Sequence, residues 1–408
     1  MSTKEVALVL GGTVPHVELI RQLRGRGYYV ILIDYLDDSP AKRFADEHIQ
    51  ESTLDQEAVL KVAINRNAAL VISSAIDQAN IICCYVAEKL DLPHPYSYEM
   101  ALNATHKDRM KRIMVEGGVS TAPFVDAEDV KGLEEAGIGF PCVVKPTNSS
   151  GSKGVRVARN AEELERYLPL AKEASSTNDA IIESFVSGLE VSSYFYVQDG
   201  VAYSLATCQK SNYTRCSRDV VRQYESVIYP AEISKDANDT LTAAANKIAR
   251  ALDLKNTPLF VQAIIEESGN AYVLEFALRL GGGLCFRSIP LLTGFNFINA
   301  SICSYLGETI DICADTVTSK KLLIGNMFAK AGHFDHVEGV EEAVAGGLIR
   351  EFYNIKTKGA EIGADGSSGS RFGQFISLGR NRDELFRKEE AARTIIKAFD
   401  VNGLMISV

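Results

Sequence analysis

The chain has 408 residues, of which 46% are hydrophobic and 24% are charged, the composition of an ordinary globular protein. Its formal net charge of −10 argues against a sequence-independent nucleic-acid binder, which needs a dominant positive field. The cysteines form no CxxC pair, and the start of the chain lacks the pattern of a signal peptide. No apolar run approaches the roughly 20 residues that span a bilayer. We therefore expect a cytoplasmic protein with no nucleic-acid and no membrane partner.

The first hundred residues have the pattern of a parallel α/β unit. Residues 6–12 form an apolar strand that ends in two glycines, residues 15–27 predict a helix, and residues 28–34 predict a second strand. The glycine turn at 11–15 does not complete a GxGxxG pattern, so a dinucleotide site is disfavoured there. We place the end of this unit near residue 100, where prolines interrupt the pattern.

A loop of small residues flanked by basic charge is the first candidate for chemistry. Residues 142–146 and 154–157 predict two strands, and Lys145 and Lys153 supply positive charge beside the loop between them. Small side chains let backbone N–H groups approach phosphate oxygens. A Walker P-loop is excluded because GxxxxGK[ST] is absent, and a solvated hairpin turn is the alternative. The loop residues concerned are Ser149, Ser150, Gly151, Ser152 and Gly154.

Two β-hairpins follow, at residues 190–210 and 259–283. Antiparallel pairing across the second turn can bring Gln262 and Glu275 side by side, and two oxygen ligands on one face suit Mg²⁺. An ordinary cross-strand polar pair is the alternative. Glu190 lies at the start of the first hairpin, where the chain arrives from the strand before it. Its carboxylate could accept hydrogen bonds from ribose hydroxyls, or it could be a solvated loop acid.

The order of these features resembles the ATP-grasp superfamily over nearly the whole chain. A lysine helix (THKDRMK), the lysine strand with its loop, ESFVSGLE and VQAIIEESGNAYVLEFALRLGGG succeed one another as in carbamoyl phosphate synthetases, biotin carboxylases and amino-acid ligases. The resemblance implies an α/β fold with antiparallel sheets in a two-subdomain ATP-grasp region. Its expected parts are a Rossmann-like pre-ATP-grasp domain (1–100), a small lid subdomain (101–187), a large subdomain (188–310) and a C-terminal closing domain (311–408).

The resemblance also implies which residues bind ATP. Lys107 and Lys145 match the lysines that hold the α-phosphate and its neighbours, and the loop from Asn148 to Gly154 matches the flap over the β- and γ-phosphates. Glu190 matches the ribose-binding acid. The adenine hinge, where backbone atoms do much of the recognition, matches Glu183, Ser184, Phe185 and Val186.

The implied metal ligands are Gln262 and Glu275, for Mg²⁺ with Mn²⁺ as an alternative. Many members have glutamate at the first position, although carbamoyl phosphate synthetases resemble this chain in having glutamine. Ala277 stands where a metal-binding asparagine is usual, so Glu275 is expected to carry most of the metal binding. A degenerate second metal site is an open alternative.

Substrate contacts are implied around Arg279, which matches the arginine that steadies the charged acyl intermediate. Beyond it lies a glycine run whose amides could contact an oxyanion. A basic loop at residues 209–224 could recognise an acidic or phosphorylated substrate, or could be a solvated surface. The candidates are Lys210 as a catalytic residue, and Arg215, Arg218, Gly281, Gly282 and Gly283 as substrate contacts.

The activity implied by the resemblance is that of an ATP-dependent carboxylate–amine ligase. Mg-ATP would phosphorylate a carboxylate, and an amine would displace phosphate from the acyl phosphate to give an amide. A bicarbonate-using carboxylase or a phosphoribosylglycinamide synthetase-like ligase is one alternative, and a non-catalytic ATP-binding regulator, suggested by Ala277, is another. The expected partners are a small-molecule carboxylate and a small-molecule amine. The resemblance also allows a homodimer.

Overall fold

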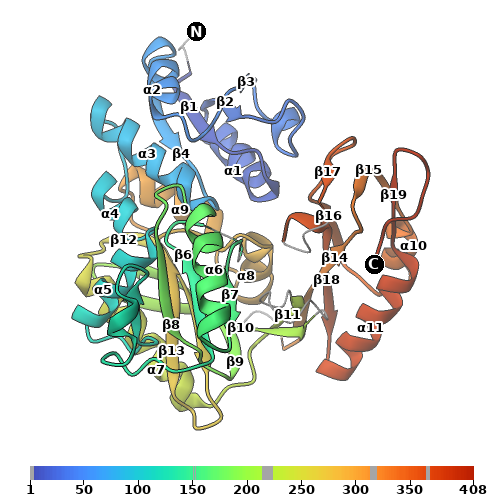
Figure 1. Cartoon of the computed structure of the whole chain (residues 1–408). Coiled ribbons are helices and arrows are strands. Elements are labelled where there is room, and N and C mark those ends of the chain that lie inside the picture. Colours follow the sequence, from blue (N-terminus) through green and yellow to red (C-terminus); the bar gives the residue numbers. More distant parts are fainter. Residues whose placement is uncertain (1–3, 150, 152, 214–223, 313–318, 364–367) are drawn as a thin grey trace.

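Four sheets organise the residues that the computed structural model describes, which are 4–149, 151, 153–213, 224–312, 319–363 and 368–408. Figure 1 shows the N-terminal unit above a central body of strands and the C-terminal part beside it. The central body combines a small antiparallel sheet with the longest sheet of the chain. The predicted α/β class with antiparallel sheets is confirmed.

The N-terminal unit is a parallel sheet of order β3-β2-β1-β4. Its strands are short apolar runs joined by helices, because a parallel strand can only be reached by a crossover connection. The pairing of β1 with β2 confirms the strand, helix and strand predicted at the start of the chain. The elements are β1 (Val6–Leu10), α1 (Val14–Gly25), β2 (Tyr29–Asp34), a 3₁₀ turn (Lys42–Phe44), β3 (Glu47–Gln50), α2 (Gln56–Asn65), β4 (Ala68–Ile72) and α3 (Asp77–Leu90).

The lid sheet, defined here as β5-β8-β6-β7, is antiparallel throughout. The pairing of β6 with β7 confirms that the small-residue loop joins two strands of a hairpin. This region comprises α4 (Tyr98–Asn103), α5 (Lys107–Glu116), β5 (Phe124–Asp126), a 3₁₀ turn (Val130–Leu133), β6 (Cys142–Pro146), β7 (Arg156–Ala158), α6 (Ala161–Glu173) and β8 (Ala180–Ser184).

The large sheet has the order β13-β12-β9-β10-β11-β14-β18-β16. The predicted turn between β9 and β10 is present, with Asp199 at φ 49° and Gly200 at φ 75°, the left-handed conformations that favour a tight hairpin. Its first elements are β9 (Leu189–Gln198), β10 (Val201–Tyr213), β11 (Tyr224–Tyr229), α7 (Lys235–Ala251), β12 (Asn256–Ile265), β13 (Ala271–Ala277), α8 (Cys285–Thr293) and α9 (Phe297–Leu306).

Three strands from the expected closing domain, β14, β18 and β16, complete the large sheet, and three others form a small antiparallel sheet of order β17-β15-β19. β11 pairs with β14, so the sheet runs across the expected boundary at residue 310. The domain limits themselves stay a prediction. The remaining elements are β14 (Lys321–Phe328), β15 (Gly332–Glu338), α10 (Val340–Ala345), β16 (Glu351–Asn354), β17 (Glu361–Ile362), a 3₁₀ turn (Ser368–Ser370), β18 (Arg371–Gly379), α11 (Arg382–Ile395) and β19 (Lys397–Asp400).

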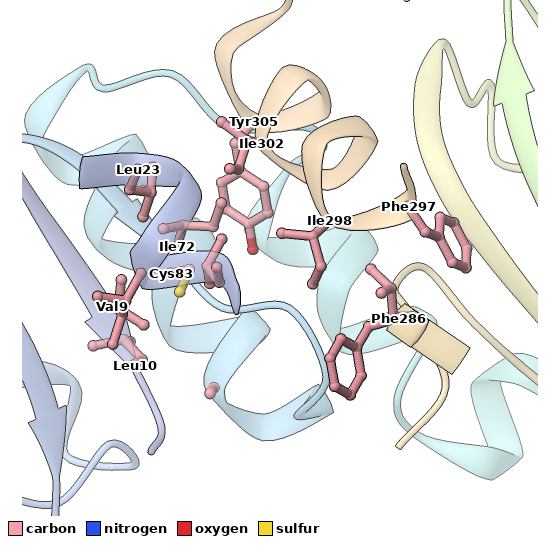
Figure 2. Packing of buried hydrophobic residues seen from close by; sticks show 14 of the residues in the cluster. Val9, Leu10, Leu23, Ile72, Cys83, Phe286, Phe297, Ile298, Ile302 and Tyr305 are labelled. Atoms are coloured by element: carbon pink, nitrogen blue, oxygen red, sulfur yellow. The ribbon is translucent and has the colours of Figure 1, made fainter. Parts of the chain in front are cut away.

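One apolar core continues from the N-terminal sheet into the helices that cover the large sheet. Figure 2 shows Val9 and Ile72 of the N-terminal unit on one side and Ile298, Ile302 and Tyr305 of α9 on the other. Each fully buried aliphatic side chain of this kind contributes about 1.5–3 kcal/mol. The N-terminal unit is therefore held firmly against the central body.

Helices α8 and α9 form a strongly apolar pair. No single helix in the described ranges is long and apolar enough to cross a membrane, and only this pair, bent by 108°, reaches such a composition when taken together. In this structure both helices contribute to the buried core.

Candidate active site

Two lysines share one buried carboxylate on the lid sheet. Lys145 lies in β6 and Glu183 in the neighbouring β8, where the two side chains form an ion pair. Lys111 of α5 approaches the other oxygen, with Nζ 2.8 Å from Glu183 Oε2, and donates to Thr121 Oγ1 at 2.7 Å. Lys111 and Glu183 are each 1% exposed. Two cations therefore face one anion in a site with little water.

Burial, together with the neighbouring charge of Lys111, lowers the pKa of Lys145 from its usual 10.5 to about 7. The carboxylates of Glu275 and Glu190 on the large sheet act in the opposite direction. Burial likewise lowers the pKa of Lys111 to about 7. An arriving phosphate would restore both lysines towards their protonated form.

Lys107, the other predicted phosphate lysine, opens α5 and binds the start of the small-residue loop. Its backbone N–H donates to Thr147 O at 2.8 Å, and its Nζ donates to Ser149 O at 2.6 Å. Gly154 at the far end of the loop has φ +77°, and a Cβ there would lie 2.6 Å from Ala174 Cβ. The predicted contacts Ser150 and Ser152 lie outside the described residues.

The predicted adenine hinge connects the two sheets. β8 ends at Ser184, and the chain crosses to β9, which begins at Leu189. Phe185 is 44% exposed on this crossing. The Glu183 side chain, in contrast, points away to the two lysines, so only the backbone of this residue remains for adenine. Gly188 passes so close to β12 that a Cβ would lie 2.3 Å from Ile265 O.

Four polar side chains form a row across neighbouring strands of the large sheet. In strand order they are Glu275, Gln262, Glu190 and Lys210, from β13, β12, β9 and β10. Gln262 is the register partner of Glu275, which confirms the predicted pairing across the second hairpin. Lys210 forms an ion pair with Glu190. The amide orientation that satisfies both neighbours turns the Gln262 nitrogen to Glu275 and its oxygen to Lys210 Nζ, 3.0 Å away.

The basic segment at 209–224 was predicted as a loop, and this is wrong where the structure describes it. Lys210 lies inside β10, whose residue Gln209 pairs with Val191 of β9, because the strand pattern of the hairpin continues through it. Lys210 therefore lies beside the expected ribose acid. Arg215 and Arg218 lie outside the described residues.

Glu275 offers carboxylate oxygens suited to Mg²⁺, whose shell is usually completed by water and phosphates. The Gln262 amide oxygen faces Lys210, so the amide has to turn over before Gln262 can share a cation with Glu275. Ala277, which follows on the same strand, is buried and adds no ligand. Within the described ranges, no three histidine, cysteine, aspartate or glutamate side chains converge on a point. The donor set fits a hard cation held jointly by the chain and a bound phosphate, and it does not form a complete protein cage.

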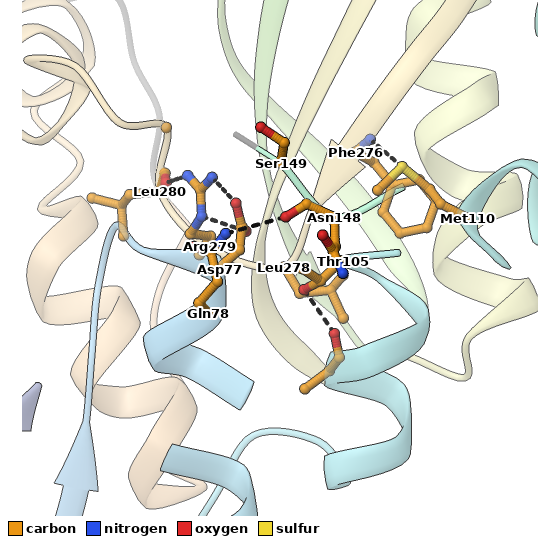
Figure 3. A network of polar contacts seen from close by, with 12 residues as sticks. Asp77, Gln78, Thr105, Met110, Asn148, Ser149, Phe276, Leu278, Arg279 and Leu280 are labelled. Atoms are coloured by element: carbon orange, nitrogen blue, oxygen red, sulfur yellow. Dashed lines mark hydrogen bonds and ion pairs between the residues drawn. The ribbon is translucent and has the colours of Figure 1, made fainter. Parts of the chain in front are cut away.

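Arg279 just beyond β13 is held by an acid of the N-terminal unit. Its Nε donates to Asp77 Oδ1 at 2.6 Å, its Nη2 pairs with Asp77 Oδ2, and its Nη1 donates to Leu280 O (Figure 3). Burial alone would lower the pKa of Arg279, but the Asp77 carboxylate outweighs it and raises the pKa. Sequence reasoning missed Asp77, which looks like an ordinary acid in the first turn of α3.

The glycine run follows Arg279 and leads into α8. Gly281 packs against Tyr194, because a Cβ there would lie 3.0 Å from the tyrosine ring. Gly282 is exposed, and Gly283 is half-buried. Only these two positions leave backbone accessible beside Arg279.

A cavity of about 1100 Å³ separates the N-terminal unit from the C-terminal part. Its walls come from α1, the 38–44 segment, α8, β15, β16 and residues 356–358, and one hydrogen bond of 3.0 Å from Thr357 Oγ1 to Asp38 O crosses it. On the wall of this cavity, Arg287 of α8 donates hydrogen bonds to both carboxylate oxygens of Glu351. Lys145, Glu275 and Arg279 are not among its described wall residues.

The ATP-grasp domain family matches residues 138–287, the segment that carries Lys145, Glu190, Gln262, Glu275 and Arg279. The chain contains an ATP-grasp domain. This confirms the resemblance found in the sequence motifs. Three residues outside the matched segment bind residues inside it. Lys107 binds Ser149 O, Lys111 pairs with Glu183, and Asp77 accepts from Arg279.

Known proteins resemble this ATP-grasp chain over most of its length. The large chain, N-terminal section, of carbamoyl phosphate synthase from Methanopyrus kandleri is 24% identical over 322 residues, which are 74% of this chain and 54% of that protein. The chain spans about half the length of the first curated relatives it matches.

Two solved structures share the fold. The L-amino acid ligase from Bacillus licheniformis has a TM-score of 0.79 and 18% identity, and the match covers 98% of this chain and 99% of that one. The biotin carboxylase domain of 2-oxoglutarate carboxylase from Hydrogenobacter thermophilus, solved with MgADP and bicarbonate, has a TM-score of 0.78 and 17% identity. It is covered to 92%, and this chain to 100%.

Proposed function

We propose that this ATP-grasp protein is an ATP-dependent ligase that activates a carboxylate as an acyl phosphate and joins it to an amine. The observation that carries the proposal is the arrangement of Lys145 on the lid sheet opposite the carboxylates of Glu190 and Glu275 on the large sheet, with Arg279 next to them. This arrangement places cationic groups where phosphates would lie and oxygen ligands where a cation would lie. It contains no residue that needs to act as a covalent nucleophile.

In this proposal the nucleotide lies between the two sheets. Lys145 and Lys107 bind phosphate oxygens, Glu190 accepts from the ribose hydroxyls, and the backbone from Glu183 to Val186 lies against the adenine. Glu275 and Gln262 hold Mg²⁺, or Mn²⁺, which neutralises charge on the phosphates. The flap from Asn148 to Gly154 closes over the phosphates and excludes water.

The acid would be phosphorylated next to Arg279. A carboxylate oxygen attacks the γ-phosphorus, the bond to the bridging oxygen of ADP breaks, and the acyl phosphate forms. The amine nitrogen then attacks the acyl carbon, phosphate leaves with the bonding electrons, and the nitrogen loses a proton to solvent. Arg279, together with the amides of Gly282 and Gly283, stabilises negative charge on the acyl oxygen. Lys210 supports this step through its pair with Glu190.

Two alternatives remain within the same site. A bicarbonate-using carboxylase or a phosphoribosylglycinamide synthetase-like ligase is suggested by the relatives, among them formate-dependent phosphoribosylglycinamide formyltransferases. A non-catalytic ATP-binding regulator is suggested by Ala277, which removes one potential metal ligand.

We also propose a cytoplasmic location, small-molecule carboxylate and amine partners, and a homodimer, with no nucleic-acid or membrane partner.

ADP release in the presence of Mg-ATP and hydroxylamine tests the proposal. Common amino acids, formate and bicarbonate are supplied in separate wells, because hydroxylamine captures an acyl phosphate without the natural amine. Acid-dependent ADP release with formation of a hydroxamate supports the ligase and names the acid. ADP release with bicarbonate or formate alone supports the first alternative. Nucleotide binding without ADP release in any well contradicts the ligase and favours the regulator.

A further inference from the structure

We infer that Asp77 is a positioning residue that fixes the guanidinium of Arg279 for substrate binding, so that the N-terminal unit completes the acid-activating site. The inference rests on the proposed function, in which Arg279 binds the activated acid. The observation behind it is the two-point contact between Asp77 and Arg279, residues 202 positions apart in the chain (Figure 3).

Counting the donors of Arg279 shows what this contact leaves free. A guanidinium has five N–H groups. Asp77 accepts from Nε and from one N–H of Nη2, and Leu280 O accepts from one N–H of Nη1. One N–H remains on each terminal nitrogen. Both remaining donors lie in the plane of the guanidinium, so they can be offered to the oxygens of a carboxylate or a phosphoryl group.

Asp77 is itself held in place. It is the first residue of α3, where the helix dipole favours a negative charge. Three positions further on, Asn80 Oδ1 accepts a buried hydrogen bond of 3.0 Å from Tyr305 of α9. The chain just after β13 is also held by a hydrogen bond, which Tyr96 donates to Leu278 O at 2.9 Å. Tyr305 of α9 thus anchors the helix that carries Asp77, and Tyr96 anchors the chain next to Arg279.

The contact also keeps Arg279 away from the expected metal ligand. Glu275 and Ala277 are alternate residues of β13 and project to one face, and Arg279 lies in the bend that follows the strand. Glu275 lies near enough to raise the pKa of Arg279, and Ala277 between them is too small to separate them. Without Asp77, the guanidinium would be drawn towards Glu275, which would cost the site both a free arginine and a metal-binding carboxylate.

The variant Asp77→Asn tests the inference, since it keeps the side-chain shape and removes the charge. The matched control is Glu308→Gln, because Glu308 makes another ion pair to the N-terminal unit, with Oε2 2.8 Å from Arg26 Nη1, and does not touch Arg279. Asp77→Glu is the second variant, which retains a carboxylate should Asp77→Asn fail to fold. Binding of MgADP, measured by calorimetry, verifies that each variant is folded.

The first measurement is labelling of Arg279 by phenylglyoxal, followed by peptide mass spectrometry, with and without MgADP plus inorganic phosphate. Phenylglyoxal reacts with the unprotonated guanidine, so loss of the neighbouring carboxylate should speed labelling about tenfold. In the wild type and in Glu308→Gln, phosphate should protect Arg279. In Asp77→Asn this protection should be lost, and in Asp77→Glu it should be weakened.

The second measurement is acid-dependent ADP release. Asp77→Asn should lower kcat about 10- to 100-fold and raise KM for the acid, because the arginine is no longer held in a productive orientation. The affinity for MgADP should not change. If Asp77 had a merely structural role, Asp77→Asn would weaken the binding of both the nucleotide and the acid, and Glu308→Gln would have the same effect.

Unchanged labelling and phosphate protection in Asp77→Asn would overturn the inference, whether or not the protein turns over. Altered labelling with wild-type kcat and KM would also overturn it. A wild-type protein that releases no ADP with any acid contradicts the proposed function and leaves the phosphate-protection result to decide the role of Asp77. The two failures are therefore distinguishable.

Discussion

The depressed pKa of Lys145 makes nucleotide affinity depend on pH in a predictable direction. Lys145 titrates near 7 in the free protein, and a bound phosphate should raise this pKa towards the usual 10.5. The contribution of its charge to binding is therefore complete below pH 7 and is lost as the pH rises from 7 towards the raised value. We expect MgADP to bind more weakly at higher pH.

The magnitude follows from the fraction of lysine that is protonated before binding. About half of Lys145 is protonated at pH 7 and about 1% at pH 9, so the Kd should rise roughly fiftyfold, or about 2.3 kcal/mol, between these values. Lys111 and Lys145 share the Glu183 carboxylate and both have a pKa lowered to about 7, so the apparent pKa belongs to the coupled lysines. The sign of the effect does not depend on how the proton is shared.

Calorimetric titration with MgADP from pH 6 to pH 9 measures the effect, and Lys145→Arg is the control. An arginine keeps its charge throughout this range, so the affinity of the variant should depend on pH less steeply than that of the wild type, by the share that belongs to Lys145. Protonation of the nucleotide itself is common to both proteins and cancels in the comparison. Equal pH dependence in the wild type and in Lys145→Arg would refute the assignment to Lys145.

Three further substitutions test separate parts of the site. Glu275→Gln should lower Mg²⁺-dependent turnover roughly hundredfold or more, since it removes the charged ligand, whereas Glu267→Gln in the exposed turn of the same hairpin should not. Glu183→Gln leaves two buried lysines without a carboxylate and should cost about 3–5 kcal/mol in urea unfolding. Gly188→Ala should cost about 1–3 kcal/mol, because its Cβ would lie 2.3 Å from Ile265 O; an unchanged urea midpoint would contradict either stability prediction.

Features that depend on neighbouring residues were predictable from the sequence. The turn at Asp199 and Gly200 sets the pairing of β9 with β10 next to the turn, and the short turn after β12 brings Gln262 and Glu275 to the same region of the second hairpin. The exact partner of Gln262 is set by a register shift between Gln262 and Ala263, which alternation and turn type do not predict. The order of these motifs was also enough to indicate the ATP-grasp fold.

Contacts between distant segments were not predictable. Asp77 and Arg279 meet only because α9 packs the N-terminal unit onto the large sheet, and nothing local to Asp77 indicates this. Lys111 lies four residues after Lys107 on α5 and looks like part of a solvated basic face. Its burial depends on Glu183, which arrives from β8, 72 residues later in the chain. Long-range packing decides such roles, and a single sequence does not show it.

The distribution of charge explains why the two sheets need a ligand between them. On the lid sheet and α5, Lys111 and Lys145 face the single carboxylate of Glu183, so this side has an excess of positive charge once a bound phosphate keeps both lysines protonated. On the large sheet, the two glutamates of the polar row outnumber Lys210, so the opposite side has an excess of negative charge. A free anion would suit only the first side, and a free cation only the second. Under the proposed function, a nucleotide phosphate chain that carries its own divalent cation would satisfy both sides at once.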